Sequence, residues 1–235
     1  MVEPRILGVV GGTGPASTVD FYQALVAGQE ARRHDDSFPR VIVNSIDGNE
    51  LKPYVLAGDH AGAAAMLGEA VGRLAAAGAG LALFASVTTH FVFDEVAATS
   101  PIPMLSIVDA TARAVQAGGY SRPGIFATRP TTDGAFFARP FQAAGIDLVR
   151  PTEAERDWIH DVYFREFLYG VFTDAARTRL TEIAATMRDR DGIDALILGG
   201  TELPLILTEP TCAGVPVVST TQAHVAEALD WLLGA

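Results

Sequence analysis

The chain has 235 residues, of which 49% are hydrophobic and 19% are charged, with a mean hydropathy of +0.25. This composition excludes an intrinsically disordered chain and is sufficient for one large domain or two small ones. The 17 basic and 28 acidic residues give a net charge of −11, and no basic stretch interrupts the sequence. A nucleic-acid partner is therefore not expected.

The residue counts also restrict the possible cofactors. Lys52 is the only lysine, which argues against a Schiff base with pyridoxal phosphate. Cys212 is the only cysteine, so neither an internal disulfide nor a zinc site built from several cysteines is possible. The five histidines are too scattered for metal-ligand spacing. We expect an enzyme without pyridoxal phosphate, another cofactor or a metal.

The sequence carries no signal for export or membrane insertion. Glu3 stands where a signal peptide would be basic, and the richest apolar run, 74–85, is interrupted by glycines and too short to span a bilayer. We expect a soluble cytoplasmic protein with no membrane partner.

Short apolar runs alternate with longer Ala-rich amphipathic stretches along the whole chain. Strands are expected at 6–10, 41–44, 81–84, 104–107, 124–127, 147–149, 195–198 and 217–219. Helices are expected at 17–33, 59–77, 90–98, 109–117, 131–144, 153–169, 174–190 and 221–233. This alternation predicts an α/β fold with parallel sheets covered on both faces.

Three pairs of segments repeat along the chain at offsets of 113 to 115 residues. The pairs are 10–13 with 125–128, 78–86 with 192–200, and 103–106 with 216–219. A shared offset in a shared order favours a duplication over the general likeness of buried parallel strands. The repeat predicts two pseudo-symmetric α/β halves.

We place the first half at 1–115 with 216–235, and the second half at 116–215. Ligands of such proteins usually bind at the carboxyl ends of the strands. The repeat therefore predicts an active-site cleft between the halves, with Thr13, Ser86, Thr128 and Gly200 around it.

The loop that follows the first strand is rich in glycine. Residues 11–18 read GGTGPAST, which lets the backbone approach a ligand and presents free N–H groups at a helix start. As a dinucleotide-binding signal the loop is weak, because Ser17 stands where a third glycine is expected. A tight strand–helix turn explains it equally well.

Four other loops place small polar residues after expected strands. Residues 86–90 read SVTTH, and three hydroxyls with an imidazole are costly to bury unless they are hydrogen-bonded or used. Helix capping by Ser86 and Thr88 is the alternative reading. Arg129 and Glu202 lie in two further loops, where they suit a carboxylate ligand and an acid, but also a solvated surface and a helix start. His224 follows the last strand and can equally be a packing group.

Together these motifs resemble the aspartate/glutamate racemase superfamily, nearest its aspartate racemase branch. The resemblance runs nearly end to end and rests on residues 7–15, 20–22, 88–90, 93–95, 198–203 and 220–224. It implies two pseudo-symmetric α/β halves and cofactor-free proton removal next to a carboxylate. It also implies two thiols, one from each half, that flank the substrate.

The sequence departs from this family at both thiol positions. The first position falls on Ser86 and the second on Gly200, which has no side chain to carry a proton. Cys212 lies in the loop before the last strand, and we expect it to be a packing or surface residue. Racemisation by two thiols is therefore excluded.

Losing one side of a two-sided mechanism leaves one-sided proton chemistry of the lyase, decarboxylase, isomerase or cyclase type on a small amino or dicarboxylic acid. We expect Ser86, His90 or Glu202 to handle the proton. Substrate contacts are expected from Thr13, Thr88, Thr89, Arg129, Thr131, Thr201 and His224. We also expect a homodimer that acts in amino acid metabolism.

Three alternatives stay open at this point. One is a racemase with non-thiol groups, such as Glu202 opposite Ser86. Another is a carboxylate-binding homologue that has lost its chemistry. A nucleotide-binding oxidoreductase is the least favoured.

Overall fold

The computed structural model describes residues 5–234, which divide into two compact units. Unit 1 holds the described residues up to Ile107 together with those from His224 onward, and unit 2 is Val108–Ala223. The chain thus passes between units after Ile107 and after Ala223, where the sequence analysis placed boundaries after 115 and 215. No helix within residues 5–234 is long and apolar enough to cross a membrane.

Unit 1 is built on a parallel four-stranded sheet. Its strands are β1 (Leu7–Gly11), β2 (Val41–Ser45), β3 (Leu81–Phe84) and β4 (Met104–Leu105), in the order β2-β1-β3-β4. All residues of β1 and β3 are buried, which fits two central strands covered on both faces.

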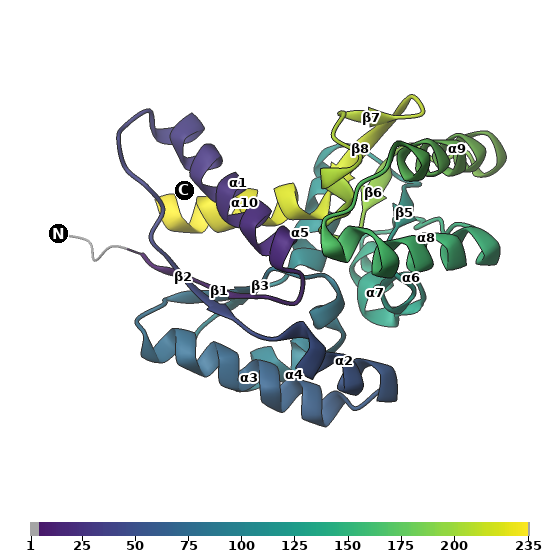
Figure 1. Ribbon diagram of the computed structural model, residues 1–235. Helices are drawn as coiled ribbons and strands as arrows, with labels where there is room; N and C mark the ends of the chain where they lie inside the picture. Colours follow the sequence, from purple (N-terminus) through teal and green to yellow (C-terminus); the bar gives the residue numbers. More distant parts are fainter. Residues whose placement is uncertain (1–4, 235) are drawn as a thin grey trace. The chain divides into compact units, whose positions relative to one another are not determined.

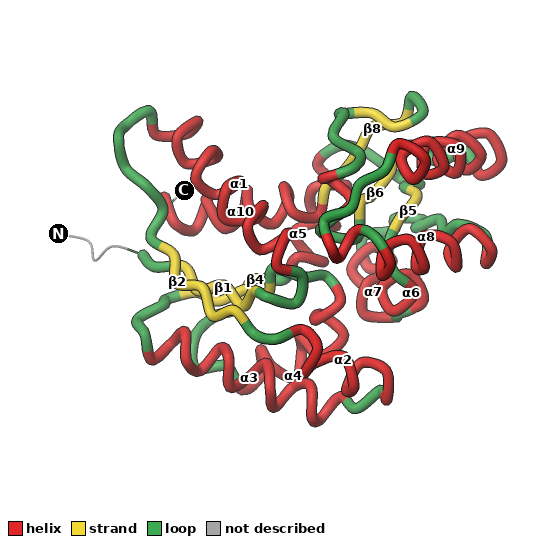
Figure 2. Tube along the Cα trace, in the orientation of Figure 1, coloured by secondary structure: helices red, strands yellow, loops and turns green. Residues whose placement is uncertain are grey.

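Helices cover both faces of the unit 1 sheet (Figures 1 and 2). One face packs against α1 (Pro15–Arg33) and α10 (Thr220–Leu233) through Phe21, Leu25 and Leu229. The other packs against α2 (Gly48–Ala57), α3 (His60–Ala76), the 3₁₀ helix η1 (Thr88–Val92) and α4 (Phe93–Thr99). Two apolar layers therefore enclose the strands and fix the loops at their ends.

Unit 2 contains a second four-stranded sheet, of mixed direction. Its strands are β5 (Gly124–Phe126), β6 (Leu196–Leu198), β7 (Thr211–Cys212) and β8 (Val215–Ser219), in the order β5-β6-β8-β7. Only the edge strand β7 runs antiparallel. The predicted α/β fold with parallel sheets is confirmed, and the strands related by the repeat occur in matching order, β1-β3-β4 and β5-β6-β8.

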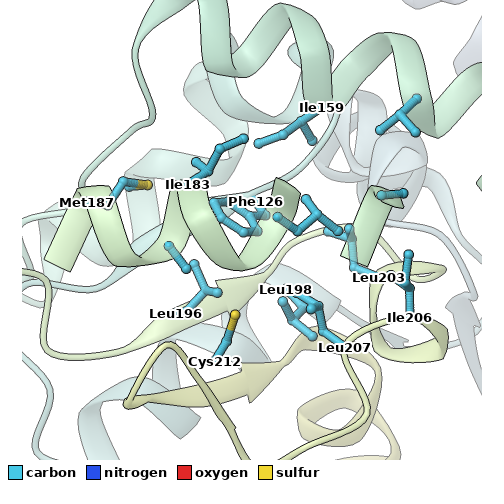
Figure 3. Packing of buried hydrophobic residues seen from close by; sticks show 14 of the residues in the cluster. Phe126, Ile159, Ile183, Met187, Leu196, Leu198, Leu203, Ile206, Leu207 and Cys212 are labelled. Atoms are coloured by element: carbon cyan, nitrogen blue, oxygen red, sulfur yellow. The ribbon is translucent and has the colours of Figure 1, made fainter. Parts of the chain in front are cut away.

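The helices of unit 2 are α5 (Ile107–Ala117), α6 (Arg129–Asp133), α7 (Ala135–Ala143), α8 (Glu153–Arg165) and α9 (Asp174–Asp191), with 3₁₀ helices η2 (Phe167–Tyr169) and η3 (Leu203–Leu205). The main core of the unit lies between the sheet and two of these helices (Figure 3). Phe126 and Leu198 from the sheet pack there with Ile159 of α8 and Ile183 of α9. This packing fixes α8 over the sheet.

The structure differs from the expected elements in a few places. The expected helix 131–144 is interrupted at Gly134, whose extended backbone ends α6 and begins α7. The helix expected to reach 169 ends at Arg165. Helix α2 was not predicted, since its N-cap Asp47 reads equally as a turn residue. The strand expected at 147–149 remains a single parallel bridge from Val149 to Gly124.

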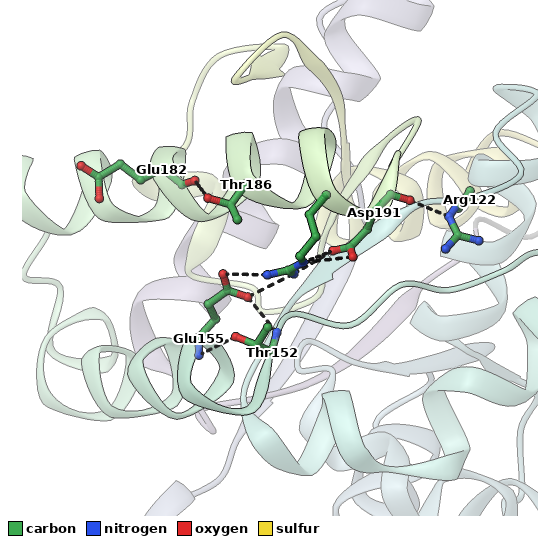
Figure 4. A network of polar contacts seen from close by, with 7 residues as sticks. Arg122, Thr152, Glu155, Glu182, Thr186 and Asp191 are labelled. Carbon is green, nitrogen blue, oxygen red and sulfur yellow. Dashed lines mark hydrogen bonds and ion pairs between the residues drawn. The ribbon is translucent and has the colours of Figure 1, made fainter.

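The N-terminus of α8 is fixed by a polar network (Figure 4). Thr152 and Glu155 form a capping box, in which the Thr152 N–H donates to Glu155 Oε2 at 2.7 Å. Arg190 of α9 donates to the same carboxylate. Partial burial raises the pKa of Glu155, but these hydrogen bonds outweigh it and the net pKa is lowered. The network ties α8 to α9.

Candidate active site

In the segment after β1, the hydroxyl groups of Ser17 and Thr18 form hydrogen bonds with the backbone of the same segment. The N–H of Gly12, where φ is +89°, donates to Thr18 Oγ1 at 2.9 Å. The hydroxyls of Ser17 and Thr18 both donate to the Gly14 carbonyl oxygen. Gly14 begins α1 without a side-chain cap. Thr13 is half-buried in this loop. Its contact with a substrate remains a prediction.

The loop after β3 is organised by His90, which is only 3% exposed. Its Nδ1 lies 2.9 Å from the Ser86 carbonyl oxygen, which also accepts from the Thr89 hydroxyl. Its Nε2 accepts from the N–H of Ile107 at 3.1 Å. Because a carbonyl only accepts and an N–H only donates, the ring is neutral with its proton on Nδ1. Both ring nitrogens are therefore engaged by the backbone.

Burial lowers the pKa of His90 to about 4, which keeps the ring neutral near pH 7. The ring stacks on Phe93 at a centroid distance of 4.9 Å. Helix capping by Ser86 and Thr88 is not found, since Val87 precedes η1 and no side chain caps it. His90 thus joins the end of β3 to the start of α5.

His224 is fully buried and lies next to the same segment. Its Nε2 donates to the Leu105 carbonyl oxygen at 3.1 Å, and its ring meets Phe21 and His90 edge-on. Both candidate histidines of unit 1 consequently bind the backbone of 105–107. Their predicted roles in proton transfer and substrate binding remain predictions.

In unit 2, Arg129 is already occupied by acidic partners. Its guanidinium pairs with Asp157 and with Asp133, and these contacts raise its pKa. The backbone N–H of Arg129 donates to Nδ1 of His160 at 3.3 Å. An arginine held by two carboxylates is poorly placed to bind a third.

Two buried threonine hydroxyls of unit 2 have no hydrogen-bond partner among the described residues. They belong to Thr131, in α6 after β5, and to Thr221, in the first turn of α10 after β8. By contrast, the hydroxyl of Thr220 donates to the Leu198 carbonyl oxygen at 2.9 Å. A buried hydroxyl without a partner costs about 1–3 kcal/mol, so it commonly marks a place for a ligand or water. The sequence analysis selected Thr131 but missed Thr221.

In the loop after β6, a buried carboxylate lies beside a buried phenol from α8. Tyr163 of α8 is 5% exposed and Glu202 is 2% exposed. The Tyr163 hydroxyl donates to Glu202 Oε2, and the Glu202 N–H donates back to the phenol oxygen at 3.3 Å. The Thr201 hydroxyl donates to the same carboxylate oxygen at 3.1 Å.

The Tyr163 ring occupies the space beside Gly200. A Cβ atom added at Gly200 would lie 2.6 Å from the ring carbon Cε2 and 2.9 Å from the phenol oxygen. Burial first, and the Glu202 charge second, raise the pKa of the phenol well above its ordinary value. The absence of a side chain at Gly200 is therefore matched by a side chain from another element.

Residues 10–228 match the sequence model of the Asp/Glu/Hydantoin racemase family. The chain belongs to this family.

Solved structures agree with this assignment. A Yersinia pestis protein proposed to be an Asp/Glu racemase is 28% identical, with a TM-score of 0.87 over 97% of this chain and 99% of the other. An aspartate racemase homologue from Pyrococcus horikoshii is 26% identical, with a TM-score of 0.83 over the same shares. A Picrophilus torridus aspartate racemase, 21% identical, shares the fold, with a TM-score of 0.78 over 98% of this chain and 94% of the other.

Membership in the Asp/Glu/Hydantoin racemase family indicates an enzyme of the isomerase class. The one thiol of this chain, that of Cys212 in β7, lies in the core of unit 2 and packs with Leu196 and Leu207 (Figure 3). Cys212 also borders a cavity of about 310 Å³ lined by Arg177 and Thr181. Burial raises the pKa of the thiol, which disfavours the reactive thiolate.

One residue at the candidate site of this racemase-family protein could not be found from the sequence patterns. Tyr163 lies in the middle of a helix, and its sequence neighbours are those of an ordinary amphipathic surface helix. Only the three-dimensional packing brings it to Gly200. Within residues 5–234, no group of three or more His, Cys, Asp or Glu side chains is arranged to hold a metal ion.

Proposed function

We propose that this protein is a cofactor-independent enzyme that moves a proton next to a carboxylate of a small amino or dicarboxylic acid. We further propose that the proton chemistry is one-sided, of the lyase, decarboxylase, isomerase or cyclase type. Family membership supports an enzyme of this general kind, and the contacts of His90 in unit 1 and of Tyr163 with Glu202 in unit 2 support the restriction to one side.

The observation that carries the proposal is the engagement of His90. Serine is a weak base unless a neighbour removes its proton, and His90 is the imidazole nearest in sequence to Ser86. Both nitrogens of that ring are bonded to backbone groups, at 2.9 and 3.1 Å. In the loop after β3, Ser86 is therefore not activated by His90, while unit 2 retains the Tyr163–Glu202 pair.

The buried hydroxyls of Thr131 and Thr221 support a carboxylate-bearing ligand. Each can donate one hydrogen bond, and an ionised carboxylate accepts several. Both lie in the helices that follow the carboxyl ends of β5 and β8, and ligands of α/β proteins bind outside such strand ends. Thr131→Val and Thr221→Val should each raise KM about tenfold with little change in kcat, which is the pattern for uniform substrate binding.

Deuterium exchange tests the proposal directly. The protein is incubated in D₂O with both enantiomers of aspartate and glutamate, a 2-substituted malonate and maleate, and each mixture is followed by proton NMR and polarimetry. We expect either deuterium at one carbon with retained optical rotation, or a new product that carries one deuterium. No exchange and no new product with any of these acids would contradict the proposal.

A second candidate function is a racemase with non-thiol groups, which the Tyr163–Glu202 pair favours because it provides a proton-bearing group beside Gly200. The same experiment separates the two. Racemisation gives deuterium at the α-carbon together with loss of optical rotation. Binding without turnover, measured by calorimetry with the same acids, would instead favour a carboxylate-binding homologue.

A further inference from the structure

The Tyr163–Glu202 pair is an unusual structure to place at the end of a buried strand. A carboxylate that is 2% exposed is costly to bury unless hydrogen bonds compensate. Here two hydroxyls donate to one of its oxygens, those of Tyr163 and Thr201. Buried titratable groups with a specific partner cluster at functional sites, although ion-pair networks with a structural role also produce them.

The position of the pair points to a function. Gly200 comes two residues after the end of β6, and ligands of parallel α/β sheets bind outside such strand ends. The phenol oxygen lies 2.9 Å from the point where a side chain of residue 200 would begin. The Tyr163 hydroxyl thus occupies the space that a side chain of residue 200 would otherwise fill.

We propose that the phenol oxygen of Tyr163 is the atom that exchanges a proton with the substrate, and that Glu202 takes up the phenol proton that this exchange displaces. This inference rests on the proposed function and names the group in unit 2 that carries it out.

The proton transfer balances without any further reactant. In the resting pair, Tyr163 is a phenol and Glu202 a carboxylate. As the phenol oxygen takes the proton from the carbon next to the substrate carboxylate, the phenol proton passes to Glu202 Oε2. The C–H electron pair moves into the substrate as an enolate, and the pair ends as a phenol and a carboxylic acid. The reverse transfer returns one proton to the carbon or to a rearranged product.

Glu202 makes this transfer feasible for a group as weakly acidic as tyrosine. The raised pKa of the phenol disfavours a free phenolate. Passing the proton on to Glu202 in the same step avoids that phenolate, because a phenol is present before and after the transfer. The hydrogen bond from the Glu202 N–H holds the phenol oxygen in place during the exchange.

The test compares two phenylalanine variants in the deuterium-exchange assay, with whichever acid the wild-type protein turns over. Tyr163→Phe removes only the hydroxyl and keeps the ring beside Gly200. Tyr169→Phe is the matched control, since Tyr169 is 78% exposed and lies in η2, just after α8. We expect Tyr163→Phe to lower kcat about a hundredfold or more, with KM changed less than threefold. We expect Tyr169→Phe to match the wild type.

Glu202→Gln provides the second arm. If the two side chains act as one relay, Glu202→Gln should lower kcat to a similar degree, and the double variant should be no slower than the slower single variant. Thermal unfolding of every variant is recorded to show that each is folded at the assay temperature. A structural role alone would lower the unfolding temperature and leave kcat near the wild-type value.

The outcomes separate this inference from the proposed function. A wild-type protein that exchanges deuterium while Tyr163→Phe exchanges equally fast would overturn the role of Tyr163 and leave the proposed function intact. Full multiplication of the two single-variant effects would overturn the relay. A wild-type protein that turns over none of the acids would overturn both.

Discussion

The buried histidines show that a residue that is chemically conspicuous in the sequence can have its ring bonded to the backbone in the structure. His90 and His224 are both fully or nearly fully buried, and both bind the backbone of residues 105–107. Each ring nitrogen bonded to a backbone group satisfies a donor or acceptor that burial would otherwise leave without water.

The neutral state of His90 should make the stability of the protein depend on pH. The pKa of His90 is about 4 in the folded protein and about 6.5 when unfolded, so below pH 6.5 the unfolded chain binds more protons. We expect the contribution of His90 to be complete above pH 6.5. It should fall by about 3 kcal/mol as the pH drops from 6.5 to 4, at 1.36 kcal/mol per pKa unit.

Urea unfolding from pH 7.5 to 4 checks this expectation in the wild type and in His90→Gln. The carboxylates titrate in both proteins, so the difference between the two curves of unfolding free energy against pH isolates His90. A difference that stays constant over this pH range would show that the imidazole titrates normally in the folded state.

Replacement of the thiol should leave the chemistry unchanged. Cys212 packs in the core of unit 2, and burial raises its pKa, so Cys212→Ala should keep kcat within about twofold. The loss of one buried atom should cost about 1 kcal/mol of stability. Turnover of the variant, together with turnover of iodoacetamide-treated wild type, measures this. Cys212 would instead be a relocated base if Cys212→Ala lowered turnover about a hundredfold, and if a bound dicarboxylate protected the wild type from inactivation by iodoacetamide.

At the scale of elements, the sequence predicted most of the fold because the apolar periodicity is local information. The strands β1, β3, β5 and β6 read as short buried runs, and the repeat gave their correspondence. The loops after those strands were also identified. What the patterns could not give is which helix residue packs over which loop, as with Tyr163 beside Gly200. Nor could they show that both ring nitrogens of His90 would form hydrogen bonds with the backbone.

The packing of α1 against α10 gives a test with a matched pair of helical glycines. A Cβ at Gly28 of α1 would lie 2.5 Å from Cδ1 of Leu229, whereas a Cβ at Gly68 of α3 would meet nothing within 4 Å. We expect Gly68→Ala to stabilise the protein by about 0.5–1 kcal/mol, since alanine favours the helix. Gly28→Ala should destabilise it by about 1–3 kcal/mol, because Leu229 is buried and cannot move freely.

Chemical denaturation of both variants beside the wild type measures these free energies. Equal stabilisation by the two substitutions would mean that α10 yields to the added methyl group, and that the two helices pack loosely.

At the scale of the whole molecule, the chain crosses from each unit to the other near the start of a helix. Helix α5 begins at Ile107, where the chain leaves unit 1, and α10 begins within unit 2 but contributes Val225, Ala228 and Leu229 to the core of unit 1. The sequence of unit 1 is therefore discontinuous, whereas that of unit 2 is continuous.

Deletion of residues 224–235 should consequently affect the two units differently. We expect hydrogen–deuterium exchange in α1 and β1 to increase strongly, because the deletion removes the buried side chains that cover them. Peptides from α8, α9 and β6 should stay protected, since their core contains none of the deleted residues. Equal loss of protection throughout the chain would show that the units unfold as one.

The same connectivity governs the order in which a ribosome delivers the parts. β1 and α1 are synthesised before unit 2, whereas Leu229, which packs in the same core as Phe21 and Leu25, is synthesised after it. All of unit 2 is synthesised in between, so it can be complete while the apolar surface of α1 is still waiting for its cover. Unit 1 thus begins before unit 2 along the chain but can complete its core only after unit 2 has been made.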